Sequence, residues 1–200
     1  FFVKGEFMNE KEKMINGYLY FSGDEDLYKE RLEAKDLCFK YNNTAPSDTK
    51  ARMEIIRKLF SKTGEFFNIE SDFWCDYGYN IEIGNHFYVN HNCVMLDCAK
   101  IKFGDNVLIA PNCGFYTAGH PLDVETRINW IEFAYPITVG NNVWIGANVS
   151  VMPNVTIGDN TVIGAGSVVT KDIPSNVLAF GNPCRVIREI KPEDKFKYIK

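Results

Sequence analysis

The stretch Val139-Gly140-Asn141-Asn142-Val143-Trp144-Ile145-Gly146-Ala147-Asn148-Val149-Ser150 begins a pattern that repeats every six residues as far as Thr170. Each hexad opens with an aliphatic residue, usually followed by Gly, and carries a small or β-branched residue four positions later. Because the period is so short, the chain must bend at a fixed interval, with one short strand per hexad. Three hexads then close one triangular coil, and the repeat predicts a stack of such coils with parallel strands.

The opening Val or Ile of each hexad is expected to point inward, where its burial contributes roughly 1.5–3 kcal/mol. The neighbouring Gly, Asn and Asp permit the positive φ angles or tight turns that the corners need. A slip of one residue would put Gly, Asn or Trp144 into the aliphatic column, so the register is strongly specified. The pattern resembles the hexapeptide signature of the left-handed parallel β-helix. Its handedness comes from that resemblance, because the general crossover rule would favour a right-handed coil.

Length and composition indicate one globular domain with a small appendage: 200 residues, 46% of them hydrophobic and 24% charged. The net charge of −4 gives no electrostatic case for a nucleic-acid partner, whose binding depends on Lys and Arg. No apolar run approaches the ~20 residues of a membrane helix, and the N-terminus has no signal-peptide core. We therefore expect no membrane association and a cytoplasmic location.

The six cysteines support the same location. They form neither a CxxC pair nor a regular disulfide framework, so a reducing compartment and small buried thiols are expected. They are Cys38, Cys75, Cys93, Cys98, Cys113 and Cys184.

Two regions with different periodicity divide the chain. Residues 8–64 have helical patterns and predict an α-helical cap, which a solenoid needs because its first coil would otherwise expose an unpaired strand edge. Residues 65–190 are expected to form the mainly β domain, the parallel β-helix with its C-terminal tail. Residues 1–7 precede the first methionine and are left out of the fold prediction. The helices are expected over residues 10–18, 25–40 and 48–62.

Residues 116–136 interrupt the repeat and carry no inward column of aliphatic side chains. They are best interpreted as a loop extruded from one corner of the coil. A loop of this length within a compact domain is usually functional.

His120 is the one histidine in this loop, between Gly119 and Pro121. An imidazole on a rigid, exposed turn can act as a general base near neutral pH. The alternative is a solvated surface histidine without a role, and the interruption of the repeat favours the functional interpretation.

A three-histidine zinc site is a further alternative, because trimeric β-helix enzymes of the gamma carbonic anhydrase class use three histidines. That family places its close pair of ligands second, whereas the close pair here, His86 and His91, comes first. We therefore expect no metal.

At several motifs the chain resembles the maltose and galactoside O-acetyltransferases, over residues 8–191. The helical cap and the tail 181–190 (GNPCRVIREI) belong to this likeness. The resemblance implies a homotrimer, in which acetyl-CoA and a sugar meet in a groove between adjacent β-helices. The motifs are 76–81 (DYGYNI), 87–90 (FYVN), 117–121 (TAGHP), 136–146 (PITVGNNVWIG) and 164–174 (GAGSVVTKDIP).

The resemblance assigns the catalytic role to His120, which would take the proton from a sugar hydroxyl as its oxygen attacks the thioester. A neutral alcohol is a poor nucleophile, and a positioned base typically supplies ~10²–10⁴-fold. The backbone N–H of Ala147 corresponds to the oxyanion donor. Neither a metal nor a covalent acyl-enzyme is needed.

The resemblance also implies a set of acceptor-binding side chains. Each has a plainer alternative: Asp and Asn are common at coil corners, Glu132 can be a solvated loop charge that does not orient His120, and Arg31 can be an ordinary helix charge. One departure from the family concerns its acidic residue after the first short helix, which aligns with Ser22, so Asp24 becomes the candidate as the nearest carboxylate. The acceptor-binding candidates are Asp24, Arg31, Asp76, Tyr88, Asn90 and Glu132.

For the coenzyme, cations in an acidic chain suit the phosphates of CoA, and small residues suit a pantetheine channel close to the coil. A plain corner position remains the alternative for Ala165. The coenzyme-binding candidates are Trp144, Ala147, Ala165, Thr170, Lys171, Arg185 and Arg188.

The sequence therefore predicts an acetyl-CoA-dependent O-acetyltransferase acting on a glucose- or maltose-type sugar by direct transfer in a ternary complex. An antibiotic, an oligosaccharide or serine is the alternative acceptor, and the serine-specific enzymes carry a much longer helical N-terminus. A non-catalytic binding coil, as in ice-binding proteins, would show Thr ladders and no interruption at residues 116–136. The identity of the sugar is left open, because hexose discrimination depends on a few hydrogen bonds.

Overall fold

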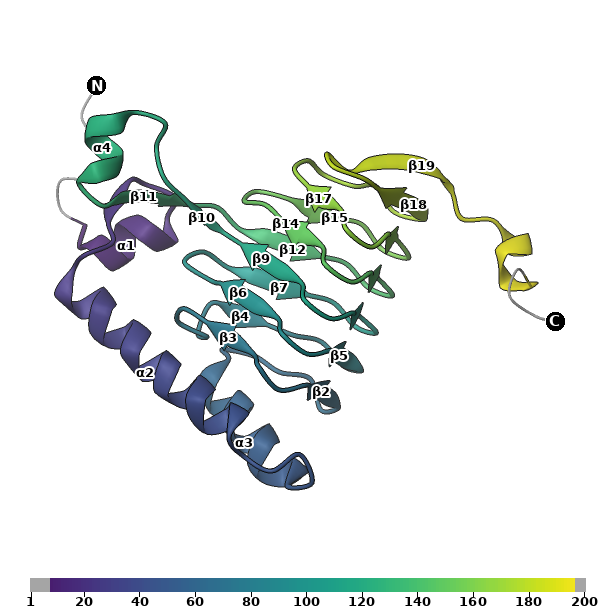
Figure 1. Ribbon diagram of the computed structural model, residues 1–200, viewed down its shortest axis with the longest axis horizontal. Coiled ribbons are helices and arrows are strands. Elements are labelled where there is room, and N and C mark those ends of the chain that lie inside the picture. Colours follow the sequence, from purple (N-terminus) through teal and green to yellow (C-terminus); the bar gives the residue numbers. More distant parts are fainter. Residues whose placement is uncertain (1–7, 197–200) are drawn as a thin grey trace.

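Short parallel strands stack into three flat sheets, which form the sides of a solenoid with helices against one end (Figure 1). The computed structural model describes residues 8–196, and residues 1–7, which the fold prediction leaves out, lie outside them. The chain visits the sheets in a fixed order, from the seven-stranded to the five-stranded to the four-stranded sheet. This is the β-helix architecture that the hexads predict.

Nearly all strands have two or three residues, as expected for one strand per hexad. The five-stranded sheet contains β3 (Trp74–Cys75), β6 (Val94–Leu96), β9 (Gly114–Tyr116), β14 (Ser150–Val151) and β17 (Val168–Val169). The four-stranded sheet contains β4 (Ile81–Glu82), β7 (Ile101–Phe103), β12 (Ile137–Val139) and β15 (Thr156–Ile157). The seven-stranded sheet contains β2 (Phe67–Ile69), β5 (Phe87–Val89), β8 (Leu108–Ile109), β13 (Trp144–Ile145), β16 (Val162–Ile163), β18 (Val177–Phe180) and β19 (Arg185–Glu189).

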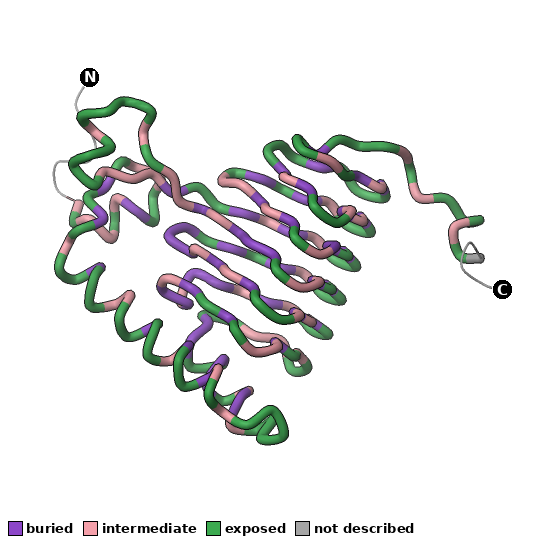
Figure 2. Tube along the Cα trace, in the orientation of Figure 1, coloured by how far each residue is buried: buried purple, intermediate pink, exposed green. Residues whose placement is uncertain are grey.

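The interior of the stack is the predicted aliphatic column, whose buried residues recur along the coils as purple stretches in Figure 2. Val139, Ile145 and Ile157 are each at most 1% exposed. The residues four positions after each opening aliphatic residue are buried as well, including the polar Thr161 and Ser167. All six cysteines are buried free thiols, which confirms their prediction as small buried residues.

Three corners join the sheets. Corner 1 follows the seven-stranded sheet, corner 2 follows the five-stranded sheet and corner 3 follows the four-stranded sheet. Asparagine repeatedly takes a positive φ at these corners, as the sequence predicts. At corner 3 the asparagine side chains form a ladder, each Nδ2 donating to the next Oδ1 at 2.9 Å. The ladder runs through Asn106, Asn142, Asn160 and Asn176.

Three N-terminal helices lie close to the predicted ranges: α1 (Glu10–Ile15), α2 (Glu25–Asn42) and α3 (Thr49–Leu59). Asp24 and Asp48 cap α2 and α3 by accepting hydrogen bonds from backbone N–H groups of the first turn. Apolar side chains of α2 and α3 pack on the first coil in one continuous core. The helices thereby cover the exposed start of the stack, and a domain boundary near residue 64 stays a prediction.

The segment 116–136 projects from corner 2 and is more ordered than its sequence indicates (Figure 1). It contains β10 (Ala118–Gly119), the short helix α4 (Val124–Ile128) and β11 (Ile131–Ala134). β11 pairs antiparallel with β10 and with β1 (Tyr20–Phe21) from the N-terminal region. The extruded segment is therefore tied to the helical cap.

The far end of the stack closes differently. β19 folds back antiparallel on β18, and a 3₁₀-helix, η1 (Pro192–Phe196), follows. No helix among residues 8–196 is long and apolar enough to cross a membrane.

Candidate active site

A pocket of about 500 Å³ lies at corner 2, where the first coils, the start of α2 and the extruded segment meet. It contains both acidic and basic side chains together with several aromatic rings, a mixture suited to a polar, uncharged ligand with apolar faces. The pocket is lined by Phe21, Ser22, Gly23, Tyr28, Arg31, Lys35, Asp76, Cys98, Trp130 and Glu132.

His120 stands beside this pocket, on the chain that leaves β10. Its Nδ1 lies 3.2 Å from the carbonyl oxygen of Ile131. A carbonyl can only accept, so this hydrogen bond assigns the proton of the neutral imidazole to Nδ1 and leaves Nε2 with its lone pair. Nε2 faces Glu132, with Oε1 at 3.7 Å, and 44% of the imidazole side chain is exposed. The geometry thus presents an accessible basic nitrogen next to a carboxylate.

Glu132 is held from its other side by Tyr20. The Tyr20 hydroxyl donates to Glu132 Oε2 at 2.6 Å, and the two residues are register partners of β1 and β11. Tyr20 is 1% exposed, and burial raises the pKa of its phenol, which therefore remains a donor. One carboxylate oxygen is fixed by Tyr20, and the other is turned toward His120.

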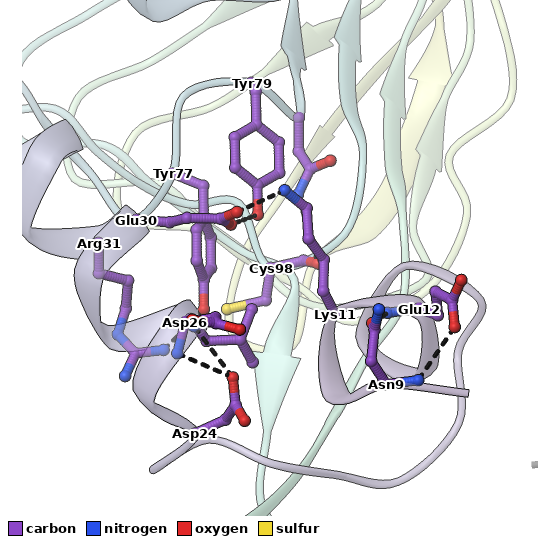
Figure 3. A network of polar contacts seen from close by, with 12 residues as sticks. Asn9, Lys11, Glu12, Asp24, Asp26, Glu30, Arg31, Tyr77, Tyr79 and Cys98 are labelled. Carbon is purple, nitrogen blue, oxygen red and sulfur yellow. Dashed lines mark hydrogen bonds and ion pairs between the residues drawn. The ribbon is translucent and has the colours of Figure 1, made fainter. Parts of the chain in front are cut away.

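Arg31 of α2 points toward Tyr77, which follows β3 (Figure 3). Its Nη1 donates to the Tyr77 hydroxyl and its Nη2 to the Ser22 carbonyl, both at 2.7 Å. These two bonds orient the guanidinium, whose positive charge lies on the pocket wall. Sequence reasoning identified Arg31 but missed both of its partners.

Asp76 and Cys98 form the coil side of the pocket. Burial raises the pKa of Asp76, and the Cys98 thiol donates to its Oδ2 at 3.6 Å. Burial also raises the pKa of Cys98, so this side chain stays a neutral thiol. Beneath them the buried Asp97 accepts hydrogen bonds from the backbone N–H groups of Asp76 and Tyr77, at 3.0 and 2.8 Å.

The structure does not bring Asp24 into the pocket. Its Oδ1 accepts hydrogen bonds from the N–H groups of Asp26 and Leu27, both at 3.1 Å, as the cap of α2 (Figure 3). Ser22 lines the pocket instead, and its hydroxyl donates to the Trp130 carbonyl at 2.9 Å. An acceptor contact from Asp24 stays a prediction.

Tyr88 and Asn90 are also outside this pocket. They belong to β5 and to the start of corner 1, on the opposite side of the five-stranded sheet. Ala147 and Ala165 stack at the same corner, where Gly166 N donates to the Ala147 carbonyl at 2.8 Å. Trp144 precedes them in β13 with 53% of its surface exposed. These residues therefore lie at corner 1 or lead into it, whereas the pocket lies at corner 2.

The remaining coenzyme candidates lie further along the stack. Thr170 and Lys171 are exposed at corner 2, two coils beyond the extruded segment. Arg185 and Arg188 lie on β19, at the end of the seven-stranded sheet. Arg188 pairs with Asp194 at 2.6 Å, so its charge is already compensated within the chain.

The three histidines lie in different parts of the structure. His86 stacks on Phe66 with 5.7 Å between ring centroids, and His91 sits at corner 1. Across residues 8–196, no group of three His, Cys, Asp or Glu side chains has the geometry to hold a metal ion.

Several pocket residues escaped the sequence prediction, including Lys35, Cys98 and Trp130. One available signal was the length of the coils: Cys75 to Ile83 and Met95 to Phe103 span eight residues instead of six. Both extra pairs fall at corner 2, as does the extruded segment. The pocket lies where the repeat is lengthened on three successive coils.

Comparisons with known proteins agree with this architecture. Residues 13–64 match the family described as the maltose acetyltransferase hexapeptide capping motif, and residues 136–171 match the bacterial transferase hexapeptide with six repeats. The fold and the site therefore define a hexapeptide-repeat acyltransferase.

Relatives that match nearly the whole chain identify the family within this class. The galactoside O-acetyltransferase of Escherichia coli (strain K12) is 48% identical over 189 residues, which cover 94% of this chain and 93% of the relative. The protein belongs to the maltose and galactoside acetyltransferase family.

Solved structures show the same likeness. A maltose O-acetyltransferase from Clostridium difficile 630 superposes with a TM-score of 0.91 at 52% identity, covering 92% of this chain and 98% of that one. A galactoside acetyltransferase in complex with coenzyme A gives a TM-score of 0.92 at 47% identity, covering 96% of each chain.

Proposed function

We propose that the protein transfers the acetyl group of acetyl-CoA to a hydroxyl of a glucose- or maltose-type sugar, with His120 as the general base. The observation that carries the proposal is the orientation of His120. Its Nδ1 bond to Ile131 leaves Nε2 free to accept a proton at the edge of the pocket. Relatives named as maltose and galactoside acetyltransferases support the choice of donor and acceptor.

The reaction is direct. The sugar hydroxyl gives its proton to His120 Nε2 as its oxygen attacks the thioester carbon, and the C–S bond then breaks. The imidazolium returns the proton to the departing thiolate. Glu132, 3.7 Å from Nε2, stabilises the positive charge that the imidazole carries between these two steps. No acyl-enzyme forms.

The acceptor is held by the polar side chains of the pocket. Asp76 and Glu132 offer acceptor oxygens to sugar hydroxyls, and Arg31 offers N–H groups. The neighbouring exposed imidazole can then reach one hydroxyl of the bound sugar.

The oxyanion that forms during transfer needs a donor, and the N–H of Ala147 is the candidate. Its neighbours Gly146 and Asn148 donate to the carbonyls of Ile163 and Pro111. Within residues 8–196 the Ala147 N–H has no such intramolecular partner. A free backbone donor at a corner is suited to an oxygen that becomes negatively charged.

Acetyl-CoA fits the candidate residues chemically. The exposed cations Lys171 and Arg185 suit phosphate groups, Trp144 offers an exposed ring, and the alanines of corner 1 leave room for a narrow chain. Arg188 would have to exchange Asp194 for a phosphate.

The division between two corners supports a trimer. His120 and the sugar pocket occupy corner 2, whereas Asn90, Tyr88, Ala147 and Ala165 lie at corner 1 or lead into it. A second copy that sets its corner 1 against corner 2 of the first would complete each groove. Light scattering tests this arrangement, and a stable monomer with full activity would contradict it.

The decisive experiment measures thiol release from acetyl-CoA with sugars, amines and antibiotics as acceptors. We expect turnover with a glucosyl or maltosyl hydroxyl, and a loss of at least ~10²-fold in His120→Ala. His86→Asn is the matched control, because it removes another exposed imidazole, at corner 3, where asparagine tolerates the positive φ of 54°. Equal turnover by His120→Ala and wild type would remove His120 from the mechanism.

A further inference from the structure

Three aromatic side chains form a rim on the pocket, and the mechanism above uses none of them. Phe21, Tyr28 and Trp130 all line the pocket. They are 42%, 56% and 66% exposed, although large aromatic side chains normally bury most of their surface. They come from β1, from the first turns of α2 and from the residue before β11, so three separate segments contribute to the rim.

Trp130 is held in an unusual backbone conformation. Its φ is 59°, in the left-handed region that bulky residues rarely adopt. The surrounding structure fixes it there, because its carbonyl accepts from both the N–H and the hydroxyl of Ser22, at 3.0 and 2.9 Å. Its own N–H donates to the Arg127 carbonyl at 3.2 Å. Glycine would meet the backbone requirement without strain, so the turn itself does not require an indole at this position.

The pocket is also large for a single sugar ring. Its volume of about 500 Å³ is typical of sites for drug-sized ligands, and one hexose is smaller than these. Asp76, Glu132 and Arg31, the charged groups that suit a reacting sugar, line the same pocket as the three aromatic side chains. The lining therefore offers aromatic surface in addition to the polar groups that the reaction uses.

We propose that Phe21, Tyr28 and Trp130 form a second binding subsite, which takes a second pyranose ring and makes the enzyme select disaccharide-length acceptors. The inference rests on the proposed sugar acetyltransferase function. A pyranose carries C–H bonds on its faces and hydroxyls on its edge, and aromatic faces attract partially positive hydrogens. Ser22 and Lys35 line the same pocket and supply polar partners for hydroxyls, which an aryl aglycone would lack.

The test compares acceptors of different length on the full chain. Steady-state kcat/KM is measured for glucose, maltose and phenyl glucoside with wild type and Trp130→Gly. Glycine suits φ of 59°, so this variant should fold. Wild type should prefer maltose over glucose by roughly tenfold, and Trp130→Gly should lose most of this preference.

Leu122→Ala is the matched control. It removes an apolar side chain that is 94% exposed on the same segment but does not line the pocket, so the maltose preference should persist. The subsite is refuted if wild type shows no maltose preference or if Trp130→Gly keeps it. A gain for phenyl glucoside equal to that for maltose would refute the second sugar ring in favour of an apolar aglycone.

A binding measurement separates this inference from the proposed function. The chain has three tryptophans, so the indole N–H signal of Trp130 can be assigned by its loss in Trp130→Gly. Maltose should shift this signal more than glucose does. If wild type acetylates no sugar at all, the proposed function fails, and the indole shift still decides whether the subsite exists.

Discussion

The coils over residues 137–170 and the coils that precede them differ in one respect, the number of residues at corner 2. In the later coils the aliphatic residues recur every six positions without interruption, and Val139, Ile145 and Ile157 form a continuous buried column. In the earlier coils corner 2 gains extra residues on three successive turns, and the pocket, Asp97 and His120 are all found there. A regular repeat builds the scaffold, and departures from the repeat build the site.

The largest expected effect belongs to the regular coils. Ile157→Ala should lower the free energy of unfolding by about 2–5 kcal/mol, because it leaves a cavity in a column with no room to collapse. Urea unfolding measures the loss, at constant protein concentration. The adjacent Thr156→Ala changes an outward-facing residue of the same strand and should stay within about 0.5 kcal/mol of wild type. Equal losses in both variants would show that the column does not carry the stability.

At corner 2, the contribution of Asp97 to the free energy of unfolding should depend on pH. Burial raises the pKa of Asp97 to about 7, against about 3.9 in an unfolded chain. Between these values the folded state binds more protons than the unfolded state, so stability falls as pH rises from about 4 to about 7. The contribution lost is roughly 2–4 kcal/mol.

Asp97→Asn removes this titration, so its unfolding free energy should depend less on pH than that of wild type. Subtracting the two urea-derived curves isolates the contribution of Asp97. Parallel curves across this window would mean that Asp97 remains ionised in the fold, supported by its backbone hydrogen bonds.

The smallest expected effect concerns the hydrogen bond by which Tyr20 holds Glu132 next to His120. Tyr20→Phe removes the hydrogen bond to Glu132 and should lower kcat by roughly 3–10-fold, with little change in KM for acetyl-CoA. Tyr20 acts as a positioning residue, so its effect should disappear when Glu132→Gln is already present. Tyr18→Phe, two residues earlier, is the control. Additive losses in the double variant would show that Tyr20 does not act through Glu132.

The sequence was sufficient for the features that depend on neighbouring residues. The six-residue period placed Val139 and Ile145 in the core, and the helical patterns over residues 25–40 and 48–62 located α2 and α3. The interruption at 116–136 located the extruded segment. All of these signals are local, and none needs a partner distant in the chain.

The rest of the site depends on contacts between distant segments. β11 lies between β10 and the distant β1, and Tyr20 of β1 reaches Glu132 of β11 across 112 positions of sequence. Asp24 became a candidate as the carboxylate nearest to Ser22 in sequence, yet it caps α2, while Ser22 itself lines the pocket. Roles such as that of Ala147 came from family resemblance, since a hexad by itself does not distinguish one corner from the next.

The backward fold of β19 onto β18 has a consequence for how the protein behaves at high concentration. In the seven-stranded sheet, all strands from β2 to β18 run parallel to one another, and only β19 is antiparallel. Without β19, the exposed edge of β18 would be a template on which a strand of another molecule could pair. β19 runs in the opposite direction, so a strand of another molecule could not extend the parallel sheet there. Its edge also carries the charged residues Arg185, Arg188 and Glu189. β19 thereby closes the edge of the seven-stranded sheet, and the helices cover the other end of the stack, so we expect the protein to resist end-to-end association.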